Sequence, residues 1–250
     1  MSTNANPIIA IASGKGGVGK TWLSITLAHL IARSGRKVLL VDGDIGLANV
    51  DVQLGLTPQK DIASALSGRH SLAEAVLHYE AGGFDIIAGR SGSASLASLA
   101  PDKLNQFIAS LVDLQKNYDA VLLDLGAGVE TQVRHLAAQA GRCIVVVTDE
   151  PTSLTDAYAF IKLMQGEAKA PLMEIAVNQA ATQKEGETTF QALNRACMNF
   201  LNISPRLLGV IRRDGKVKDS IRRQTSLVAH APGSTAATDA AAIAIKLMQR

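Results

Sequence analysis

A stretch near the start of the chain has the composition of a phosphate-binding loop. Residues 13–21 read S-G-K-G-G-V-G-K-T, with four glycines and two lysines. From Gly14 to Thr21 the spacing is G-x-x-x-x-G-K-[ST], in which the backbone N–H groups of the glycine turns and a helix start face a phosphate. Lys20 would reach the β- and γ-phosphates of a nucleotide, and the Thr21 hydroxyl would bind Mg²⁺. The loop follows a predicted strand and opens a predicted helix, a context that disfavours a glycine turn without a ligand.

Phosphoryl transfer also requires a carboxylate on the metal side and a group that places the attacking water. Asp124 ends the run D-A-V-L-L-D, so it would lie at the tip of a buried strand and hold Mg²⁺ through water; the alternative is a helix N-cap. Asp42, Asp44 and Asp51 follow the second apolar run in VDGDIGLANVD. We interpret this segment as a switch that faces the nucleotide, and a solvated acidic loop is the alternative.

A layered α/β fold would position these residues. Short apolar runs alternate with longer stretches of helical spacing, and the runs are nearly continuous, which is typical of parallel strands buried on both faces. The pattern predicts a three-layer, doubly wound, mainly parallel sheet, and the loop motif at 14–21 makes it one of the P-loop NTPase type. The predicted strands are Ile8–Ala12, Lys37–Val41, Phe84–Ala88, Ala120–Leu123, Cys143–Thr148, Leu172–Val177 and Leu207–Ile211. The predicted helices are Gly19–Arg33, Pro101–Lys116, Thr152–Gln165, Thr188–Leu201 and Ser234–Met248.

Composition narrows the class of protein. The chain has 250 residues, 47% hydrophobic and 4% aromatic, so aliphatic side chains would build the core of a single domain, residues 1–250. A net charge of +3 does not by itself indicate nucleic acid or membrane binding. Residues 1–7 are polar and are expected to be flexible, and no apolar run reaches the roughly 18 residues of a membrane span. With Cys143 and Cys197 as buried free thiols, these features predict a soluble cytoplasmic protein.

Several segments resemble one superfamily of ATPases. K-G-G-V-G-K-T at 15–21, with its early lysine, resembles the deviant Walker A loop of the MinD/ParA ATPases, and D-G-D-I-G-L-A-N-V-D at 42–51 resembles switch I of the MinD branch. The segments G-L-A-N-V-D-V-Q-L-G-L, T-D-E-P-T-S-L-T-D-A-Y-A-F-I-K-L-M and V-K-D-S-I-R-R-Q resemble the flagellar-number regulators FlhG and FleN. The resemblance covers about residues 8–248 and implies a MinD/ParA-like P-loop fold.

The resemblance implies an ATP-dependent homodimer, in which two subunits close face to face over two ATP molecules with Mg²⁺. Lys15 would cross the interface and complement transition-state charge in the partner's site, as an arginine finger does. Asp44 matches the acid that positions the hydrolytic water, Asp124 the Walker B acid, and Asn178 the asparagine that reads the adenine edge. From the residues alone, Lys15 could be a solvated loop lysine and Asn178 could satisfy loop backbone.

Together these assignments define a complete expected site. The expected catalytic residues are Lys15, Lys20 and Asp44, and the expected metal-binding residues are Thr21, Asp44 and Asp124. The expected nucleotide-binding residues are Gly14, Lys15, Gly16, Gly17, Val18, Gly19, Lys20, Thr21, Trp22 and Asn178.

Three positions depart from the family pattern. Trp22 follows Thr21 where relatives usually have Thr or Asn, and it either packs on the sheet or alters the nucleotide pocket. Leu125 follows the Walker B acid where small residues are common, which predicts slow hydrolysis. Arg212 follows the last strand where relatives usually have Pro, so the contacts around the base stay open.

The partners implied by the resemblance are the FlhF GTPase, a flagellar switch-complex protein and a flagellar transcription activator. DNA is a further candidate, because ParA proteins bind it without sequence preference through basic surface; a solvated helix face or a protein-binding surface is the alternative. The basic cluster comprises Arg206, Arg212, Arg213, Lys216, Lys218, Arg222 and Arg223. The alanine-rich final helix, 236–250, is expected to pack on the sheet, which argues against direct membrane anchoring and leaves recruitment to a cell pole or membrane to a partner.

The sequence therefore supports three functional hypotheses. The first is an ATP-dependent dimerising switch with slow Mg²⁺-dependent ATP hydrolysis that regulates flagellar number or placement. The second is a ParA-type partitioning ATPase that binds DNA non-specifically and positions DNA or protein cargo. The third is a member that binds nucleotide and hardly hydrolyses it.

Overall fold

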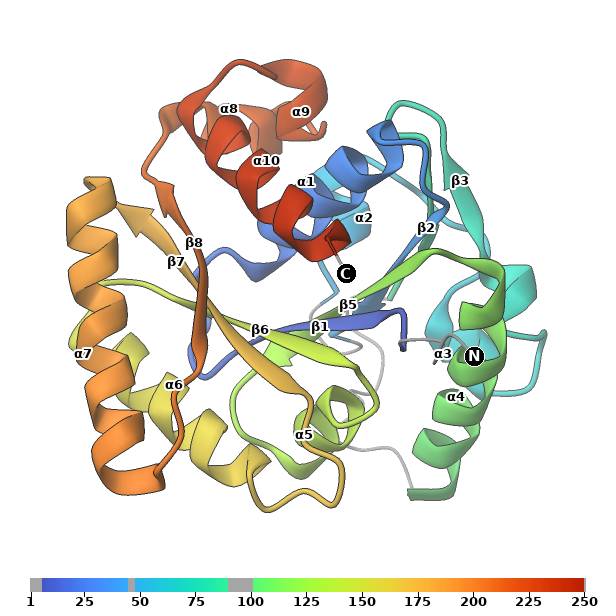
Figure 1. Cartoon of the computed structure of the whole chain (residues 1–250). Helices are drawn as coiled ribbons and strands as arrows, with labels where there is room; N and C mark the ends of the chain where they lie inside the picture. The colour runs from blue at the N-terminus through green and yellow to red at the C-terminus, as the bar shows by residue number, and fades with distance from the viewer. Residues whose placement is uncertain (1–5, 45–47, 90–100, 250) are drawn as a thin grey trace.

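The computed structural model describes residues 6–44, 48–89 and 101–249, and it is built around one eight-stranded sheet (Figure 1). The strand order is β3-β4-β2-β5-β1-β6-β7-β8, and every neighbouring pair is parallel except β3–β4. The strands are β1 Ile8–Ser13, β2 Val38–Gly43, β3 Leu77–Tyr79, β4 Phe84–Ile87, β5 Ala120–Ala127, β6 Arg142–Val147, β7 Leu172–Ala180 and β8 Arg206–Arg212. The predicted class, a doubly wound mainly parallel sheet, is confirmed.

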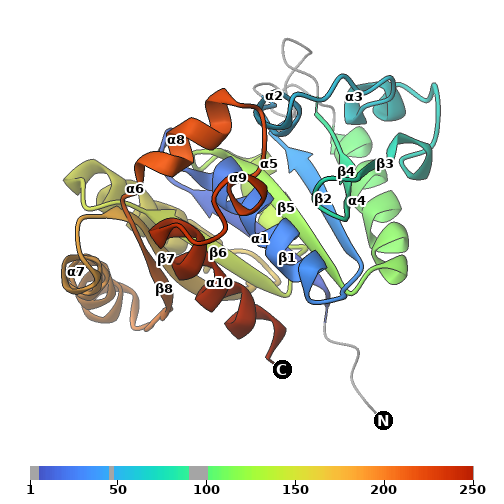
Figure 2. The same ribbon diagram turned by 90° about the horizontal axis from the view of Figure 1, so that it is seen from above.

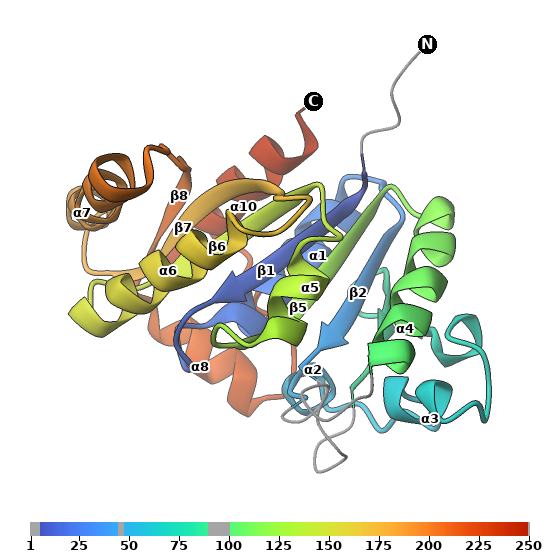
Figure 3. The same cartoon turned by 90° about the horizontal axis from the view of Figure 1, so that it is seen from below.

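Helices cover both faces of the sheet, which gives three layers (Figures 2 and 3). The helices are α1 Lys20–Arg33, α2 Val50–Leu54, α3 Ile62–Leu66, α4 Pro101–Leu114, α5 Thr131–Ala137, α6 Pro151–Met164, α7 Gln183–Leu201, α8 Gly215–Arg222, α9 Leu227–His230 and α10 Thr235–Met248. Side chains of α3 to α7 pack into the core on one face of the sheet, and side chains of α1, α2, α9 and α10 pack into the core on the other.

The central strand β1 shows why the strands read as continuous apolar runs. Ile8, Ala10 and Ala12 face the core under α3 to α7, while Ile9 and Ile11 face the core under α1 and α10. All five are buried, since successive side chains of a strand point to opposite faces and both faces are covered.

The structure differs from the sequence prediction at element ends and in short elements. Helix α7 begins at Gln183 instead of Thr188, because the Thr182 side chain accepts a hydrogen bond from Glu185 N at 3.1 Å and caps it. Strand β5 continues to Ala127, three residues beyond Asp124. The short elements β3, α2, α3, α5, α8 and α9 were not predicted. No helix in the described part of the chain is long and apolar enough to cross a membrane.

The outer strand β8 has its free edge covered by side chains of α10. Lys246 Nζ donates to Leu208 O at 2.6 Å, and the Asp239 carboxylate accepts from Arg212 N at 3.0 Å. At the other end of the sheet, β3 is only three residues long. Short strands and covered backbone groups discourage pairing with a second sheet.

A buried histidine predicts how the stability of the fold depends on pH. His29 Nδ1 on α1 lies 2.7 Å from the hydroxyl of Ser226, which caps α9. Burial, with a smaller effect of Arg33, lowers the pKa of His29 to about 4. In the unfolded chain His29 binds a proton near pH 6.5, whereas in the folded chain it does so only near pH 4. The contribution of neutral His29 to the free energy of unfolding is therefore full above pH 6.5 and is lost as the pH falls through about 4.

We therefore expect His29→Gln to reduce the acid-side loss of unfolding free energy by roughly 1–2 kcal/mol. Urea unfolding between about pH 4 and pH 7 measures this free energy. His135→Gln on the exposed face of α5 is the matched control and should leave the pH dependence unchanged. An unchanged pH slope in the His29 variant would contradict the prediction.

Candidate nucleotide-binding site

The glycine loop lies at the carboxyl edge of the sheet, between the end of β1 and the start of α1 (Figure 3). Gly17 and Gly19 have left-handed φ angles of 78° and 95°, which L-side chains rarely adopt. A Cβ on Gly14 would overlap the backbone of Asp156 in α6, and one on Gly19 would overlap the side-chain amide of Asn178 in β7. The glycines therefore allow both the turn and its close packing against α6 and β7.

Lys20 points into the protein at the end of this loop. The residue is 9% exposed, and Nζ donates to the Ser13 hydroxyl at 2.9 Å. The Ser13 hydroxyl in turn donates to Lys15 O at 2.6 Å. Burial lowers the pKa of Lys20, and the charges of Asp124 and Asp44 oppose that shift.

Asp124 lies inside β5 and not at a helix start, so the helix N-cap alternative is wrong. Asp124 is 1% exposed, and its carboxylate accepts a hydrogen bond from Ser24 Oγ at 2.9 Å. Burial raises the pKa of Asp124, and the nearby Thr21 side chain, the Lys20 charge and the Ser24 hydrogen bond lower it. A carboxylate aimed at the loop threonine is the geometry that a Mg²⁺ site needs on the protein side.

Asp42 is the buried neighbour of Asp124, since the two are paired in register on β2 and β5. Its carboxylate accepts from the backbone N–H groups of Asp44, Asn49 and Val50 at 3.2, 3.0 and 3.0 Å. Burial and the Asp124 charge raise the pKa of Asp42, while these bonds oppose the shift. Asp42 thus fixes both ends of the segment that carries Asp44 and leads into α2, and residues 45–47 of that segment lie outside the described residues.

Asp44 lies beside the loop edge at the end of β2. A Cβ on Gly126 would be 3.4 Å from Asp44 Oδ1, so the carboxylate lies against the end of β5. Its charge also reaches Lys20, whose pKa it raises. The structure therefore brings Lys20, Asp44 and Asp124 to one place, as the sequence predicted, and the role of each stays a prediction.

Lys15 is held by its own chain. Nζ contacts the Glu150 carboxylate and donates to Thr152 Oγ1 at 2.8 Å, both from the segment that opens α6. These contacts lie at the surface, so the role of Lys15 across a subunit contact stays a prediction. The contact with Glu150 and Thr152 was not predicted, although the run T-D-E-P-T places an acid and a hydroxyl two residues apart.

Two further predicted residues pack against the loop. Asn178 is 5% exposed, and its amide donates to Val18 O at 2.7 Å while its carbonyl accepts from Gln179 N at 2.9 Å. It supports loop backbone, and its contact with adenine stays a prediction. Trp22 is 4% exposed in the core beneath α1 and α10, so it packs on the sheet, although its indole Nε1 has no hydrogen-bond partner. Leu125 is also a core residue.

Helix α8 and the residues beside it carry the predicted basic residues from Arg212 to Arg223, and the helix lies on one side of the loop edge (Figure 2), whereas Arg206 begins β8, at the other end of that strand. The guanidinium of Arg212 is paired with both oxygens of Asp239, at 2.9 and 2.8 Å, so its charge is offset. The exposed members of the cluster are Arg206, Arg213, Lys216, Lys218, Arg222 and Arg223. Gln224, just after α8, donates to Val52 O at 3.3 Å and so joins this region to α2.

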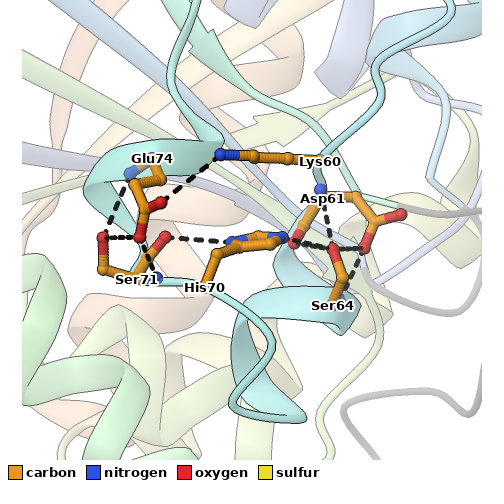
Figure 4. A network of polar contacts seen from close by, with 6 residues as sticks. All are labelled: Lys60, Asp61, Ser64, His70, Ser71 and Glu74. Atoms are coloured by element: carbon orange, nitrogen blue, oxygen red, sulfur yellow. Dashed lines mark hydrogen bonds and ion pairs between the residues drawn. The ribbon is translucent and has the colours of Figure 1, made fainter.

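A second polar cluster surrounds α3 (Figure 4). Ser64 Oγ lies 2.7 Å from His70 Nε2, a spacing that a nucleophile and its base could have. The same hydroxyl completes a capping box with Asp61 at the start of α3. His70 Nδ1 faces the backbone oxygen of Ser71 at 3.1 Å, and Glu74 closes the next turn through Ser71. The contacts are those of a capped helix and turn, so we assign the cluster a structural role.

A phosphate loop between the first strand of a parallel sheet and the helix that follows is the arrangement of P-loop nucleotide-binding proteins. The strand order and the carboxylates beside the loop place the chain in that class. Residues 9–228 match the CobQ/CobB/MinD/ParA nucleotide binding domain, and the chain belongs to this family.

Similar proteins include two with flagellar or regulatory names. The antiactivator FleN of Pseudomonas aeruginosa is 38% identical over 96% of this chain and 85% of its own length. The flagellum site-determining protein YlxH of Helicobacter pylori is 35% identical over 90% of this chain and 76% of its own. The structure of the septum site-determining protein MinD of Pyrococcus horikoshii, complexed with Mg-ADP, has a TM-score of 0.82 and 26% identity, and covers 97% of this chain and 96% of its own.

The residues present fit ATP and Mg²⁺. Within 6–44, 48–89 and 101–249, no group of three or more His, Cys, Asp or Glu could hold a metal by itself. Mg²⁺ usually binds through one or two carboxylates together with substrate phosphates, so Thr21 and Asp124 beside a phosphate loop suffice.

The close packing of the loop on α6 gives a mutational prediction. We expect Gly14→Ala to lower the free energy of unfolding by at least about 2 kcal/mol, because its Cβ must displace the backbone of Asp156. Gly16→Ala is the matched control, since its Cβ would be 4.0 Å from Ala127 Cβ, and it should change stability by about 0.5 kcal/mol or less. Urea denaturation of nucleotide-free protein measures both, and equal effects would contradict the packing.

Proposed function

We propose that the protein is an ATP-dependent dimerising switch with slow Mg²⁺-dependent ATP hydrolysis. The observation that carries the proposal is the convergence of Lys20, Asp44 and Asp124 on a complete phosphate loop that also presents Lys15. Membership in the MinD/ParA family supports it, as does the Mg-ADP complex of the similar MinD.

In this proposal each residue of the chain has a distinct task. The loop N–H groups and Lys20 bind the phosphates, and Lys20 leaves Ser13 to do so. Mg²⁺ bound beside Thr21 and Asp124 would supply positive charge to the β- and γ-phosphates. Asp44 orients the attacking water. Lys15 leaves Glu150 and Thr152 and enters the partner's site, so the contact seen here belongs to the unpaired subunit.

The biological role that we propose is control of flagellar number or placement. The names of the similar FleN and YlxH support it, and an antiactivator by name opposes an activator. A flagellar transcription activator, a switch-complex protein and the FlhF GTPase are the partners that follow from this role. A complex of the similar MinD of Aquifex aeolicus with MinC, 26% identical and with a TM-score of 0.78, supports partner binding in the family. Recruitment to a cell pole through such a partner is part of the proposal.

Light scattering tests the switch directly. We expect ATP to double the molar mass of Asp44→Ala, which retains ATP, and we expect Asp44→Ala/Lys15→Ala to stay at the mass of one subunit. ADP should leave both variants at that mass. A single-turnover control must show that Asp44→Ala hydrolyses ATP about 100-fold or more slowly than the unmodified protein. A mass that ignores nucleotide would refute the dimer, and equal hydrolysis rates would refute the task given to Asp44.

The exposed cations around α8 favour a second function, non-specific DNA binding of the ParA type. Their link to α2 through Gln224 and Val52 would let the nucleotide segment influence this surface. A protein partner with an acidic surface would use the same charges.

For the DNA candidate we expect ATP-dependent binding to random duplex that weakens steeply with salt. Arg222→Glu/Arg223→Glu should abolish DNA binding or make the fall of log K with log salt less steep by about 2 units of slope. Lys184→Glu/Arg195→Glu on exposed α7 makes the same charge change and should leave binding intact. Binding that survives the first pair of substitutions would exclude the α8 surface.

A further inference from the structure

A buried serine on α1 contacts the acid that the proposed mechanism places beside Mg²⁺. Ser24 is 0% exposed, and its Oγ lies 2.9 Å from Asp124 Oδ1 and 3.0 Å from Lys20 O. Nothing in the sequence pattern marks this residue, which follows the loop motif by one helical turn. The contact joins α1, which begins at the loop, to β5, which carries the acid.

The hydroxyl of Ser24 has one proton and two acceptors within reach. A serine in a helix often donates to the carbonyl four residues earlier, which here is Lys20 O. A hydrogen bond to an ionised carboxylate is about twice as strong as a bond between neutral groups. When Asp124 is ionised, the proton therefore points to Oδ1.

This bond restricts the rotation of the carboxylate. Ser24 on α1 is the side chain whose hydrogen bond to Asp124 the described contacts show, and Thr21, one turn earlier on the same helix, lies close enough to lower the pKa of Asp124. Its pairing with Ile11 and Asp42 on the neighbouring strands fixes the backbone beneath it. Without Ser24, Asp124 would lose this hydrogen bond, and the neighbouring Thr21 could not replace it, because the metal is expected to take the Thr21 hydroxyl.

We propose that Ser24 is a positioning residue for Asp124, which keeps the carboxylate turned toward the metal side of the phosphate site. The inference rests on the proposed function, in which Asp124 serves Mg²⁺. Partners that orient a metal-binding group typically contribute 10- to 100-fold to metal affinity. Ser24 therefore acts on the Mg²⁺-dependent part of nucleotide binding and leaves the metal-free part nearly unchanged.

The test measures binding of a fluorescent ADP derivative during a Mg²⁺ titration and in EDTA. ADP is used so that hydrolysis plays no part. We expect Ser24→Ala to raise the half-saturating Mg²⁺ concentration about tenfold and to change the affinity in EDTA less than about twofold. Ser24→Thr keeps the hydroxyl and should restore the Mg²⁺ dependence.

Thr26 provides a matched control on the same helix. It is also 0% exposed, and its Oγ1 donates to Trp22 O, four residues earlier, at 2.8 Å. Thr26→Val, like Ser24→Ala, removes one buried hydroxyl and little else. We expect it to leave the Mg²⁺ dependence unchanged, whereas equal shifts in the two variants would overturn the proposal.

A double variant separates this inference from the function on which it rests. In an Asp124→Asn background, Ser24→Ala should cause no further change in Mg²⁺ dependence, because the serine acts through the acid. If Asp124→Asn itself leaves the Mg²⁺ dependence unchanged, the metal role of Asp124 is wrong. If only Ser24→Ala leaves it unchanged, the positioning role alone is wrong. If Ser24→Ala does not fold, Ser24→Cys takes its place, because it keeps about the same side-chain volume and its thiol is a weak donor. It should then raise the half-saturating Mg²⁺ concentration, and an unchanged value would overturn the positioning role.

Discussion

The structure depends on a balance of charges that are buried where β1, β2 and β5 end. Asp42 and Asp124 face each other across neighbouring strands, with Lys20 as the buried cation beside them. Burial raises the pKa of both acids and lowers that of the lysine, so each group would be easier to keep neutral. Backbone N–H groups stabilise Asp42, whereas Asp124 faces the loop. A divalent cation would offset charge on the carboxylate side, while Lys20 and the loop N–H groups would offset charge on the phosphates.

The phosphate loop owes its shape to neighbours distant in sequence. Helix α6 approaches Gly14 so closely that no side chain fits between them, and Asn178 on β7 holds the carbonyl of Val18. Glu150 and Thr152 at the start of α6 engage Lys15. One helix thus contacts both the fixed part of the loop and its movable lysine. When Lys15 moves into the proposed subunit contact, Glu150 and Thr152 at the start of α6 lose their partner. Helix α6 therefore links that contact to the outer surface of the subunit.

Much of this arrangement was predictable, because it rests on local patterns. Continuous apolar runs located seven strands, and the glycine spacing located the loop with Lys20 and Thr21. The three-residue strand β3 was missed, since a period of two cannot be recognised over so short a stretch. Ser13, Ser24 and Glu150 were missed for a different reason. A serine or glutamate is common in any sequence, and its importance comes from a partner such as Asp124, 100 residues away, that only the fold brings near.

The two ends of the parallel strands carry different parts of the molecule. The loop, Asp44 and Asp124 occupy the edge where the parallel strands end, whereas β1 begins and α10 ends near the opposite edge (Figures 2 and 3). In the proposed face-to-face dimer, Ile8 at the start of β1 and Met248 at the end of α10 would therefore lie on the side away from the nucleotides. A bulky group attached beside either position would therefore leave room for two subunits to meet across their nucleotides.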